Sequence, residues 1–325
     1  METMSSSAVQ IRKFTLGDLP RVAEIRNASL AISPDFYSMT VDRIRSTGVA
    51  SDLQLTSEIL VAERDGVVRG YIHIYTEPHL MGDGTDGTRG LGRINIDAFH
   101  VHPEERRSGV GTLLLEAAEA KAREWNGRYM SIAIPAAVET SQTFLIKHQF
   151  QLVRYFWKLR HSELDGLPSA ELPGNLRFRT FRRGMDEAAY VELLNTTFAD
   201  HWDFAPITQP ELEEWNQRPD FDPRGSFFIV DGEREIAHIT VLVDPKRFEE
   251  THDAAARVFE LGVLPEYRGK GLGYQLLLKA SEFSREQSLN ALELVVDGQN
   301  DGAKGMYERM GFQQKRAILV FHKVL

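Results

Sequence analysis

The feature that most constrains this chain is a strand, a proline turn and a helix start that occur twice, 162 residues apart. The matching positions are Val101, Pro103, Arg106, Gly109 and Gly111 in the first copy, and Val263, Pro265, Arg268, Gly271 and Gly273 in the second. An apolar strand precedes each turn, and an amphipathic segment at helical spacing follows it. The repeat therefore predicts two domains of one kind, each of about the size that supports a single hydrophobic core.

The glycine-rich turns predict phosphate binding. A helix starts with backbone N–H groups that lack partners and with a partial positive charge, and glycine lets a ligand approach the main chain. The expected binding residues are Arg268, Gly269, Lys270, Gly271, Leu272 and Gly273 in the second copy, and Arg106, Arg107, Ser108, Gly109, Val110 and Gly111 in the first. A glycine turn can also serve packing alone, so the motif by itself is weak.

The rest of each half follows one order and predicts an α/β fold. Each half begins with a short strand and a helix, continues with a hairpin, and reaches the long strand, glycine turn and helix. A further strand, a short helix and a closing strand complete each half. We predict an N-terminal domain over residues 1–161, a linker over 162–175 that contains two prolines and two glycines, and a C-terminal domain over 176–325.

Composition excludes several classes of protein. The net charge of −9 argues against a nucleic-acid surface, which needs clustered basic residues. No apolar run is long enough to span a bilayer and the N-terminus lacks a leader pattern, so we expect a cytoplasmic protein without a membrane partner. The chain has no cysteine, so thiolate metal sites are excluded, and we expect no metal site. The more acidic second half favours a cationic acceptor there or serves solubility only.

A second motif makes the pattern specific. The segment from Asn300 through Tyr307 to Gly311-Phe312, together with the turns described above, resembles the GNAT (Gcn5-related) N-acetyltransferase superfamily. The resemblance implies two GNAT-fold domains, each a mixed, mostly antiparallel sheet flanked by helices, and acetyl-CoA as cofactor. It also implies that Asn300 helps to hold coenzyme A and that Tyr307 lies near the thioester sulfur. The tandem arrangement is similar to the mycothiol synthase group of this superfamily, which acetylates a cysteinyl sugar conjugate.

The reaction that the resemblance implies needs an acid and a base. Tyr307 is the expected acid for the departing thiolate, and Glu260 is the expected base for the attacking amine. Main-chain groups of Leu261 and Val263 are expected to orient the cofactor. Each catalytic assignment has an alternative: Tyr307 as a packed aromatic residue, Glu260 as a solvent-facing strand residue, and His238 as the base in its place.

The first half lacks these groups. At the same 162-residue offset, Val138 stands in place of Asn300, Leu145 in place of Tyr307, and Ala98 in place of Glu260, with Asp97 beside it. Leucine cannot protonate a thiolate. The N-terminal domain is therefore expected to be catalytically degenerate, either binding acetyl-CoA through its retained turn, including Val101, or serving only as a packing partner.

These inferences predict an acetyltransferase that moves an acetyl group from acetyl-CoA to a primary amine of a small molecule in the C-terminal domain. Residues 198–228, rich in aromatic and acidic side chains, are expected to shape the acceptor site. The alternatives are a non-catalytic acyl-CoA-binding sensor and a protein N-terminal or lysine acetyltransferase. The expected partners are a small-molecule amine and no nucleic acid, and the expected state is a monomer or homodimer.

Overall fold

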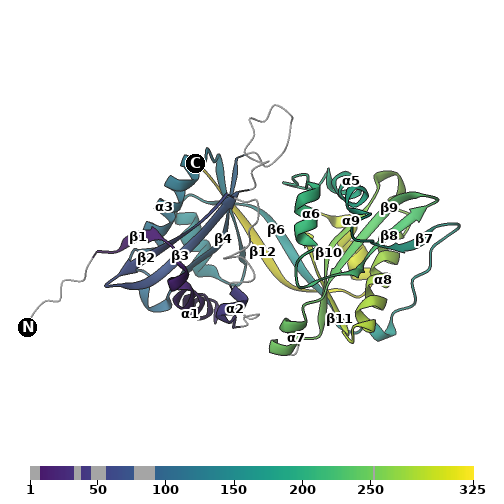
Figure 1. The fold of residues 1–325 in the computed structure, drawn as a ribbon, viewed down its shortest axis with the longest axis horizontal. Helices are drawn as coiled ribbons and strands as arrows, with labels where there is room; N and C mark the ends of the chain where they lie inside the picture. Colours follow the sequence, from purple (N-terminus) through teal and green to yellow (C-terminus); the bar gives the residue numbers. More distant parts are fainter. Residues whose placement is uncertain (1–7, 33–37, 45–55, 77–91, 252) are drawn as a thin grey trace, which may run out of the picture. The chain divides into compact units, whose positions relative to one another are not determined.

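The structure, a computed structural model, describes residues 8–32, 38–44, 56–76, 92–251 and 253–325 (Figure 1). The chain divides into two compact units. Unit 1 consists of Met1–Arg154 together with Ile318–Leu325, and unit 2 consists of Tyr155–Ala317. Each unit is built around a mixed sheet with helices packed against it.

Unit 1 has a sheet in which only β4 and β5 run parallel among the described strands. The strand order is β1 (Gln10–Lys13), β2 (Thr56–Arg64), β3 (Val67–Thr76), β4 (Arg93–Val101), β5 (Tyr129–Pro135) and β12 (Gln313–Val324). Its helices are α1 (Leu19–Leu30), α2 (Val41–Ile44), α3 (Val110–Glu124) and α4 (Glu139–Lys147).

Unit 2 repeats this architecture with β10 and β11 as its parallel pair. The strand order is β6 (Gln151–His161), β11 (Ala291–Asp297), β10 (Ala255–Val263), β9 (Arg234–Leu242), β8 (Phe221–Asp231) and β7 (Arg177–Thr180). Its helices are α5 (Glu187–Phe198), α6 (Gln209–Trp215), α7 (Pro245–Thr251), α8 (Leu272–Glu286) and α9 (Asp301–Arg309). The predicted fold class, a mixed and mostly antiparallel sheet flanked by helices, is confirmed.

The closing strands differ from the sequence boundaries of 1–161 and 176–325. Strand β6, at the end of the first half, pairs with β11 of unit 2, where Leu294 lies opposite Leu159. Strand β12, at the end of the second half, pairs with β5 of unit 1, where Phe321 lies opposite Ile132. Periodicity along the chain predicts that each strand exists, but it does not determine which partner completes the ladder.

Residues 162–175, predicted as a linker, pack against α8. Leu164 is fully buried, and its carbonyl accepts a hydrogen bond from Arg285 Nη1 at 2.9 Å. The backbone N–H of Ala170 donates to Glu282 Oε1 at 2.8 Å. The segment thus belongs to unit 2 as ordered structure.

Helices cover both faces of the unit 2 sheet. On β8, Phe227 contacts Phe283 of α8, whereas the next residue, Phe228, contacts Tyr190 of α5. Because neighbouring side chains on a strand point to opposite faces, α8 and α5 lie on opposite sides of this sheet. The α5 face carries the polar residues described below.

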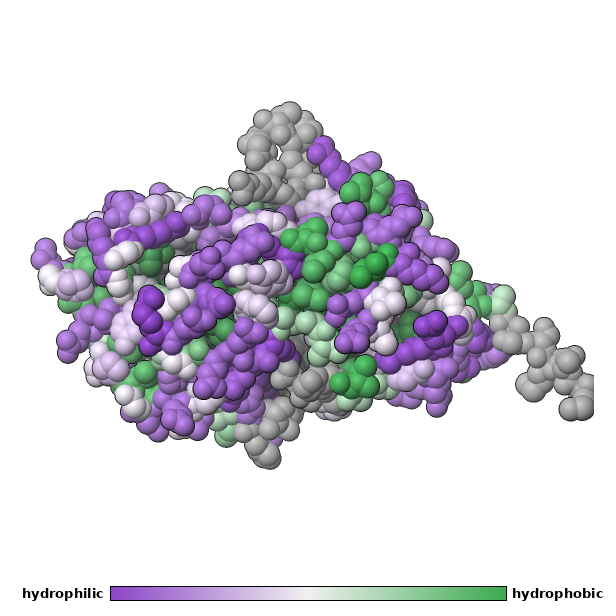
Figure 2. Space-filling model, turned by 180° about the vertical axis from the view of Figure 1, so that it is seen from behind, coloured by the Kyte–Doolittle hydropathy of each residue, from purple (hydrophilic) through white to green (hydrophobic). Residues whose placement is uncertain are grey.

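The molecular face seen in Figure 2 is mainly hydrophilic, with smaller hydrophobic areas among the polar residues. Within the described parts of the chain, no helix has the length and apolar character needed to cross a membrane.

Candidate active site

A bulge in β10 places Glu260 at the centre of a pocket in unit 2. Val258 lies opposite Val241 of β9, and Glu260 lies opposite the preceding residue, Thr240, so Phe259 is the extra residue. Strict alternation predicts that Phe259 and Glu260 face opposite sides of the sheet. The bulge instead brings both side chains into the lining of one pocket, because an extra residue re-aims the side chains beside it.

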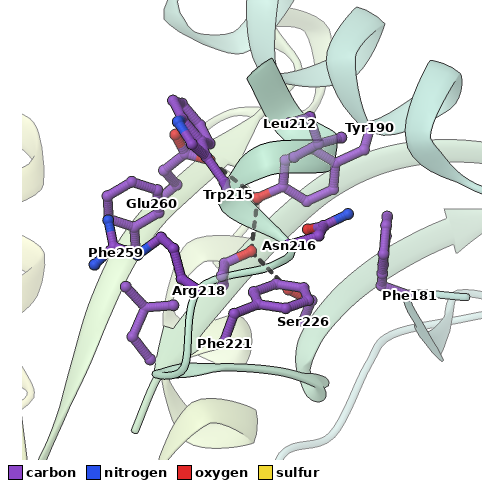
Figure 3. Close-up of a pocket in the computed structure, with 12 residues that line it drawn as sticks. Phe181, Tyr190, Leu212, Trp215, Asn216, Arg218, Phe221, Ser226, Phe259 and Glu260 are labelled. Atoms are coloured by element: carbon purple, nitrogen blue, oxygen red, sulfur yellow. Dashed lines mark hydrogen bonds between the residues drawn. The ribbon is translucent and has the colours of Figure 1, made fainter. Parts of the chain in front are cut away.

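The pocket lies between the α5 face of the sheet and helices α5 and α6 (Figure 3). It holds about 330 Å³, the space at its mouth included. Its apolar lining consists of Phe181, Leu212, Trp215, Phe221, Leu242 and Phe259. Its polar lining consists of Tyr190, Asn216, Arg218, Ser226, Thr240 and Glu260. Aromatic walls around a few polar groups are typical of a small-molecule site.

A row of hydroxyl groups leads to the carboxylate. Tyr190 donates from its hydroxyl to Glu260 Oε2 at 3.0 Å, and the same hydroxyl lies 2.6 Å from Thr240 Oγ1. Thr240 Oγ1 lies 2.8 Å from Ser226 Oγ. All three hydroxyl-bearing residues are buried. The row fixes one carboxylate oxygen of Glu260, whereas its other oxygen, Oε1, makes no hydrogen bond to the described residues.

Burial changes the acidity of Glu260. Removal of the carboxyl group from water raises its pKa from 4.5 to about 8, and the hydrogen bond from Tyr190 partly opposes this rise. A carboxyl group with a pKa this close to neutrality is suited to accept a proton during a reaction. Glu260 thus lines a pocket instead of an open strand surface, and its role as the base stays a prediction.

His238, the alternative base, lies in the core. It is fully buried, its Nε2 lies 3.0 Å from Thr197 Oγ1, and burial lowers its pKa to about 3. It does not line the pocket. An imidazole in this position stays neutral and out of contact with solvent, which argues against a role as the base.

The glycine turn of unit 2 leaves its main chain accessible. Gly269 and Gly271 have φ values of 76° and 79°, and a Cβ atom added at either position meets nothing within 4 Å. Gly271 is the N-cap of α8, and this left-handed conformation aims the turn into the helix start. The open space beside these backbone groups fits a phosphate-bearing cofactor.

The side chain of Arg268 holds this turn in place. Its Nη2 donates to the carbonyl of Thr197 at 2.9 Å, its Nε donates to the carbonyl of Val263 at 3.1 Å, and its Nη1 pairs with Asp200 at 2.7 Å. These three contacts within the protein hold the guanidinium in place without a ligand.

Tyr307 and Asn300 both lie on α9. Tyr307 is buried, packs edge-on against Phe312 at 5.7 Å, and makes no hydrogen bond through its hydroxyl within the described residues. Burial raises its pKa to about 12, so the phenol keeps its proton at neutral pH. Asn300 is the N-cap of α9, where its Oδ1 accepts from the N–H of Ala303 at 3.1 Å. Neither residue lines the pocket around Glu260.

Comparison with known proteins identifies the family. The chain matches the acetyltransferase (GNAT) family twice, over residues 24–147 and 189–312. The chain belongs to the GNAT family.

Curated relatives within this family carry one name. A mycothiol acetyltransferase of Salinispora arenicola is 30% identical over 99% of this chain and 100% of its own. That of Thermomonospora curvata is 32% identical over 79% of both chains. That of Paenarthrobacter aurescens is 33% identical over 65% of both. The predicted resemblance to a tandem GNAT protein of this group is confirmed, and the cofactor of this GNAT chain is acetyl-CoA.

Solved structures confirm the GNAT fold. A GCN5-related N-acetyltransferase from Sphaerobacter thermophilus superposes with a TM-score of 0.75 at 20% identity and covers 97% of this chain and 95% of its own. A tandem GNAT protein from the clavulanic acid biosynthesis pathway has the same TM-score at 14% identity, with 98% of each chain covered.

The GNAT domain of unit 1 keeps the turn but has leucine at the position of Tyr307. Gly109 has a φ of 89° and is the N-cap of α3, and Arg106 Nη2 donates to the carbonyl of Ser29 at 3.1 Å, as Arg268 does to Thr197. Leu145, opposite Tyr307 in the repeat, is buried in the core. Within the described residues, no group of three or more potential ligands gathers into a metal site.

Five polar residues of this pocket, Tyr190, Asn216, Arg218, Ser226 and Thr240, were not predicted individually. Ser226 and Thr240 lie in apolar strands, where small hydroxyl residues are common, and Tyr190 lies in an amphipathic helix. Only the fold brings them together with Glu260. Asn216 falls within residues 198–228, predicted to shape the acceptor site, as do Trp215 and Phe221, which line the pocket.

Proposed function

We propose that this GNAT protein transfers the acetyl group of acetyl-CoA to a primary amine of a small molecule, and that unit 2 performs the reaction. The observation that carries the proposal is Glu260, whose carboxyl group lies in an aromatic-walled pocket with a pKa of about 8. A half-buried titratable group with a shifted pKa and a specific partner in a concave site is typical of a catalytic centre.

Different residues of unit 2 would bind the cofactor, accept the proton of the amine and stabilise the departing thiolate. Backbone N–H groups from Arg268 to Gly273 hold the diphosphate, and Asn300 helps to place the cofactor. When bound, acetyl-CoA supplies an acetyl thioester. Glu260 accepts a proton from the amine, directly or through water, at the carboxylate that Tyr190 orients. Tyr307, protonated at neutral pH, donates a hydrogen bond or proton to the departing sulfur.

The pocket supports a small acceptor. Its lining comes from α5, α6, the residues that follow α6 and three neighbouring strands, and it combines aromatic walls with a few polar groups, as small-molecule sites do. The curated relatives are named mycothiol acetyltransferases, so an amine precursor of mycothiol is the first acceptor to test. Protein N-termini and lysine side chains are tested beside it.

We also propose that unit 1 does not catalyse the transfer. Its turn keeps the conformation of the unit 2 turn, which supports acetyl-CoA binding there, but Leu145 offers no proton for a thiolate. A calorimetric titration that counts acetyl-CoA sites decides between a binding unit and a packing partner. Two sites support binding by both turns, and one site restricts binding to one unit.

Release of coenzyme A thiol with a panel of amines and peptides tests the proposal. We expect release with a small primary amine and a large loss in Glu260→Gln, because the amide cannot accept the proton. If acetyl-CoA binds but no acceptor gives release, the chain is an acyl-CoA sensor. If only peptides react, the acceptor is a protein.

A further inference from the structure

Asn216 occupies an unusual position in the pocket wall. It is the C-cap of α6, its N–H donates to the carbonyl of Leu212 at 2.9 Å, and its own carbonyl accepts from Arg183 Nη2. These backbone contacts hold the residue in place, and only 4% of its surface is exposed. Its side chain lines the pocket (Figure 3).

The carboxamide of Asn216 has no partner. Both Oδ1 and Nδ2 are buried and make no hydrogen bond to any described residue. The three buried hydroxyl groups of the same pocket, those of Tyr190, Thr240 and Ser226, are all hydrogen-bonded. Buried polar groups in folded proteins are nearly always paired. Arg64 Nε and His238 Nδ1 are also buried without a partner among the described residues, but Asn216 differs from them because it lines the pocket and both polar atoms of its side chain are unpaired. This combination points to a missing ligand group.

The chemistry of that group follows from what Asn216 offers. A carboxamide presents a donor at Nδ2 and an acceptor at Oδ1. A carboxylate satisfies only the donor, an ammonium group satisfies only the acceptor, and an alkyl group satisfies neither. A neutral amide or hydroxyl group satisfies both.

The charged groups of the lining do not pair with Asn216. Arg218 donates two hydrogen bonds of 2.9 Å to Asp220, which also pairs with Arg257 at 3.3 Å. Glu260 is the carboxyl group reserved for the reacting amine. Neither side chain hydrogen-bonds the carboxamide of Asn216, so the choice of ligand group there rests on its own donor and acceptor.

We propose that Asn216 is a specificity-determining residue that selects amine acceptors carrying an uncharged group able both to donate and to accept a hydrogen bond. The inference rests on the proposed function of unit 2 and extends it from a primary amine to an amine with a neutral polar group. The amine lies at Glu260 and the polar group lies at Asn216, so the acceptor spans the pocket between them.

Matched probes test this assignment. Glycinamide and isobutylamine have nearly the same shape, and only glycinamide carries the polar group. β-Alaninamide with isopentylamine, and 4-aminobutanamide with its alkyl analogue, extend the spacing. For each pair, kcat/KM by thiol release is compared per unprotonated amine, because a nearby amide lowers the pKa of the amine and would by itself change the rate. The binding of each probe is measured from its shift of the melting temperature without acetyl-CoA.

In the wild type, we expect at least one amide to exceed its alkyl analogue by about tenfold or more in kcat/KM, since a site built for a polar group rejects analogues that lack it. In Asn216→Leu, this ratio should fall to near one. Gln217→Leu makes the same chemical change at the next, exposed residue, and there the ratio should be retained. The melting temperature of Asn216→Leu should stay level or rise, because an unpaired polar group leaves the interior.

The outcomes separate this inference from the proposed function. Equal rates for every matched pair in the wild type overturn the role of Asn216 and leave the acetyltransferase intact. A fall in the melting temperature of Asn216→Leu with an unchanged ratio assigns the amide to the fold and also overturns it. If no probe is acetylated, the proposed reaction fails, and amide-selective binding that Asn216→Leu abolishes still supports the site.

Discussion

Replacing Tyr190 with phenylalanine removes one hydroxyl group from the pocket and leaves the ring in place. The ring packs edge-on against Phe181 at 5.7 Å and against Phe228 at 5.8 Å, and phenylalanine keeps both contacts. The hydroxyl is the only described group that hydrogen-bonds Glu260, at 3.0 Å. The variant therefore changes the environment of one carboxylate with little change in packing.

The size of the effect follows from that hydrogen bond. Burial raises the pKa of Glu260 to about 8, and the bond from Tyr190 lowers it. A hydrogen bond to a charged group contributes about 1.5–3 kcal/mol, and one pKa unit corresponds to about 1.4 kcal/mol. Its loss should raise the pKa of Glu260 by about one unit or more. Activity near pH 7 should then fall about tenfold and recover at alkaline pH, where the carboxylate forms in both proteins.

The assay is kcat/KM for thiol release from about pH 6 to about pH 10, with one acceptor for all variants so that its own ionisation cancels. Ser226→Ala is the control, because it removes the hydroxyl at the far end of the row, which does not contact Glu260. Its midpoint should move much less than that of Tyr190→Phe. A profile for Tyr190→Phe that coincides with the wild-type profile would refute the assignment of Glu260 as the base under the control of Tyr190.

Three further predictions concern the other residues of the site. Glu260→Gln should lower kcat by about a hundredfold or more. The melting temperature of this variant relative to the wild type should rise between about pH 5 and about pH 9, because a folded-state pKa raised above 4.5 makes the wild type lose stability as pH increases through this window. A difference that stays constant with pH would contradict the raised pKa. Tyr307→Phe should lower kcat by about ten- to a thousandfold with little change in acetyl-CoA affinity, and unchanged turnover would remove Tyr307 from the mechanism. Gly271→Ala should weaken acetyl-CoA binding and activity, because a φ of 79° strains an L-residue and the methyl group enters the open space beside the turn. The matching variant of unit 1, Gly109→Ala, at a φ of 89°, should leave turnover largely intact. A loss of activity in a folded Gly109→Ala protein would contradict the assignment of catalysis to unit 2.

The sequence predicts those parts of the fold that depend on local chemistry. The turns at Gly109 and Gly271 follow from glycines that need a positive φ, and both helix starts lie where the amphipathic pattern places them. The closing strands were assigned to their own halves because the chain order suggests it. Their actual partners, β11 for β6 and β5 for β12, are set by contacts between residues far apart in the sequence.

The same distinction applies to the site. The prediction of Glu260 as the base rests on its position in the strand before the turn, and that role stays a prediction. Strict alternation gives the wrong face for its neighbour Phe259, because a two-residue period cannot predict a bulge. Tyr190 and Asn216 come from helices whose sequences show only amphipathic spacing. Tyr190 is important because its hydroxyl hydrogen-bonds Glu260, and Asn216 is important because its carboxamide has no partner.

Comparison of the two units supports the proposal that unit 2 performs the reaction. In unit 1, Ala98 lies opposite His73 on the neighbouring strand, as Glu260 lies opposite Thr240 in unit 2. The nearby carboxylate, Asp97, has a side chain that is 58% exposed and lies 3.2 Å from His73 Nδ1, and this contact lowers its pKa. A carboxylate that is permanently charged is a weak base near neutral pH.

Glu260 of unit 2 differs from Asp97 of unit 1 in its exposure, its hydrogen-bond partner and its pKa. Its carboxyl group is half-buried, receives its hydrogen bond from a neutral phenol, and keeps a pKa of about 8, while an unpaired amide lies in the same pocket. Both features lower the stability of the folded chain, and a core selected for stability alone would contain neither. Two destabilising groups in one pocket fit the proposed acceptor, which would pair with both.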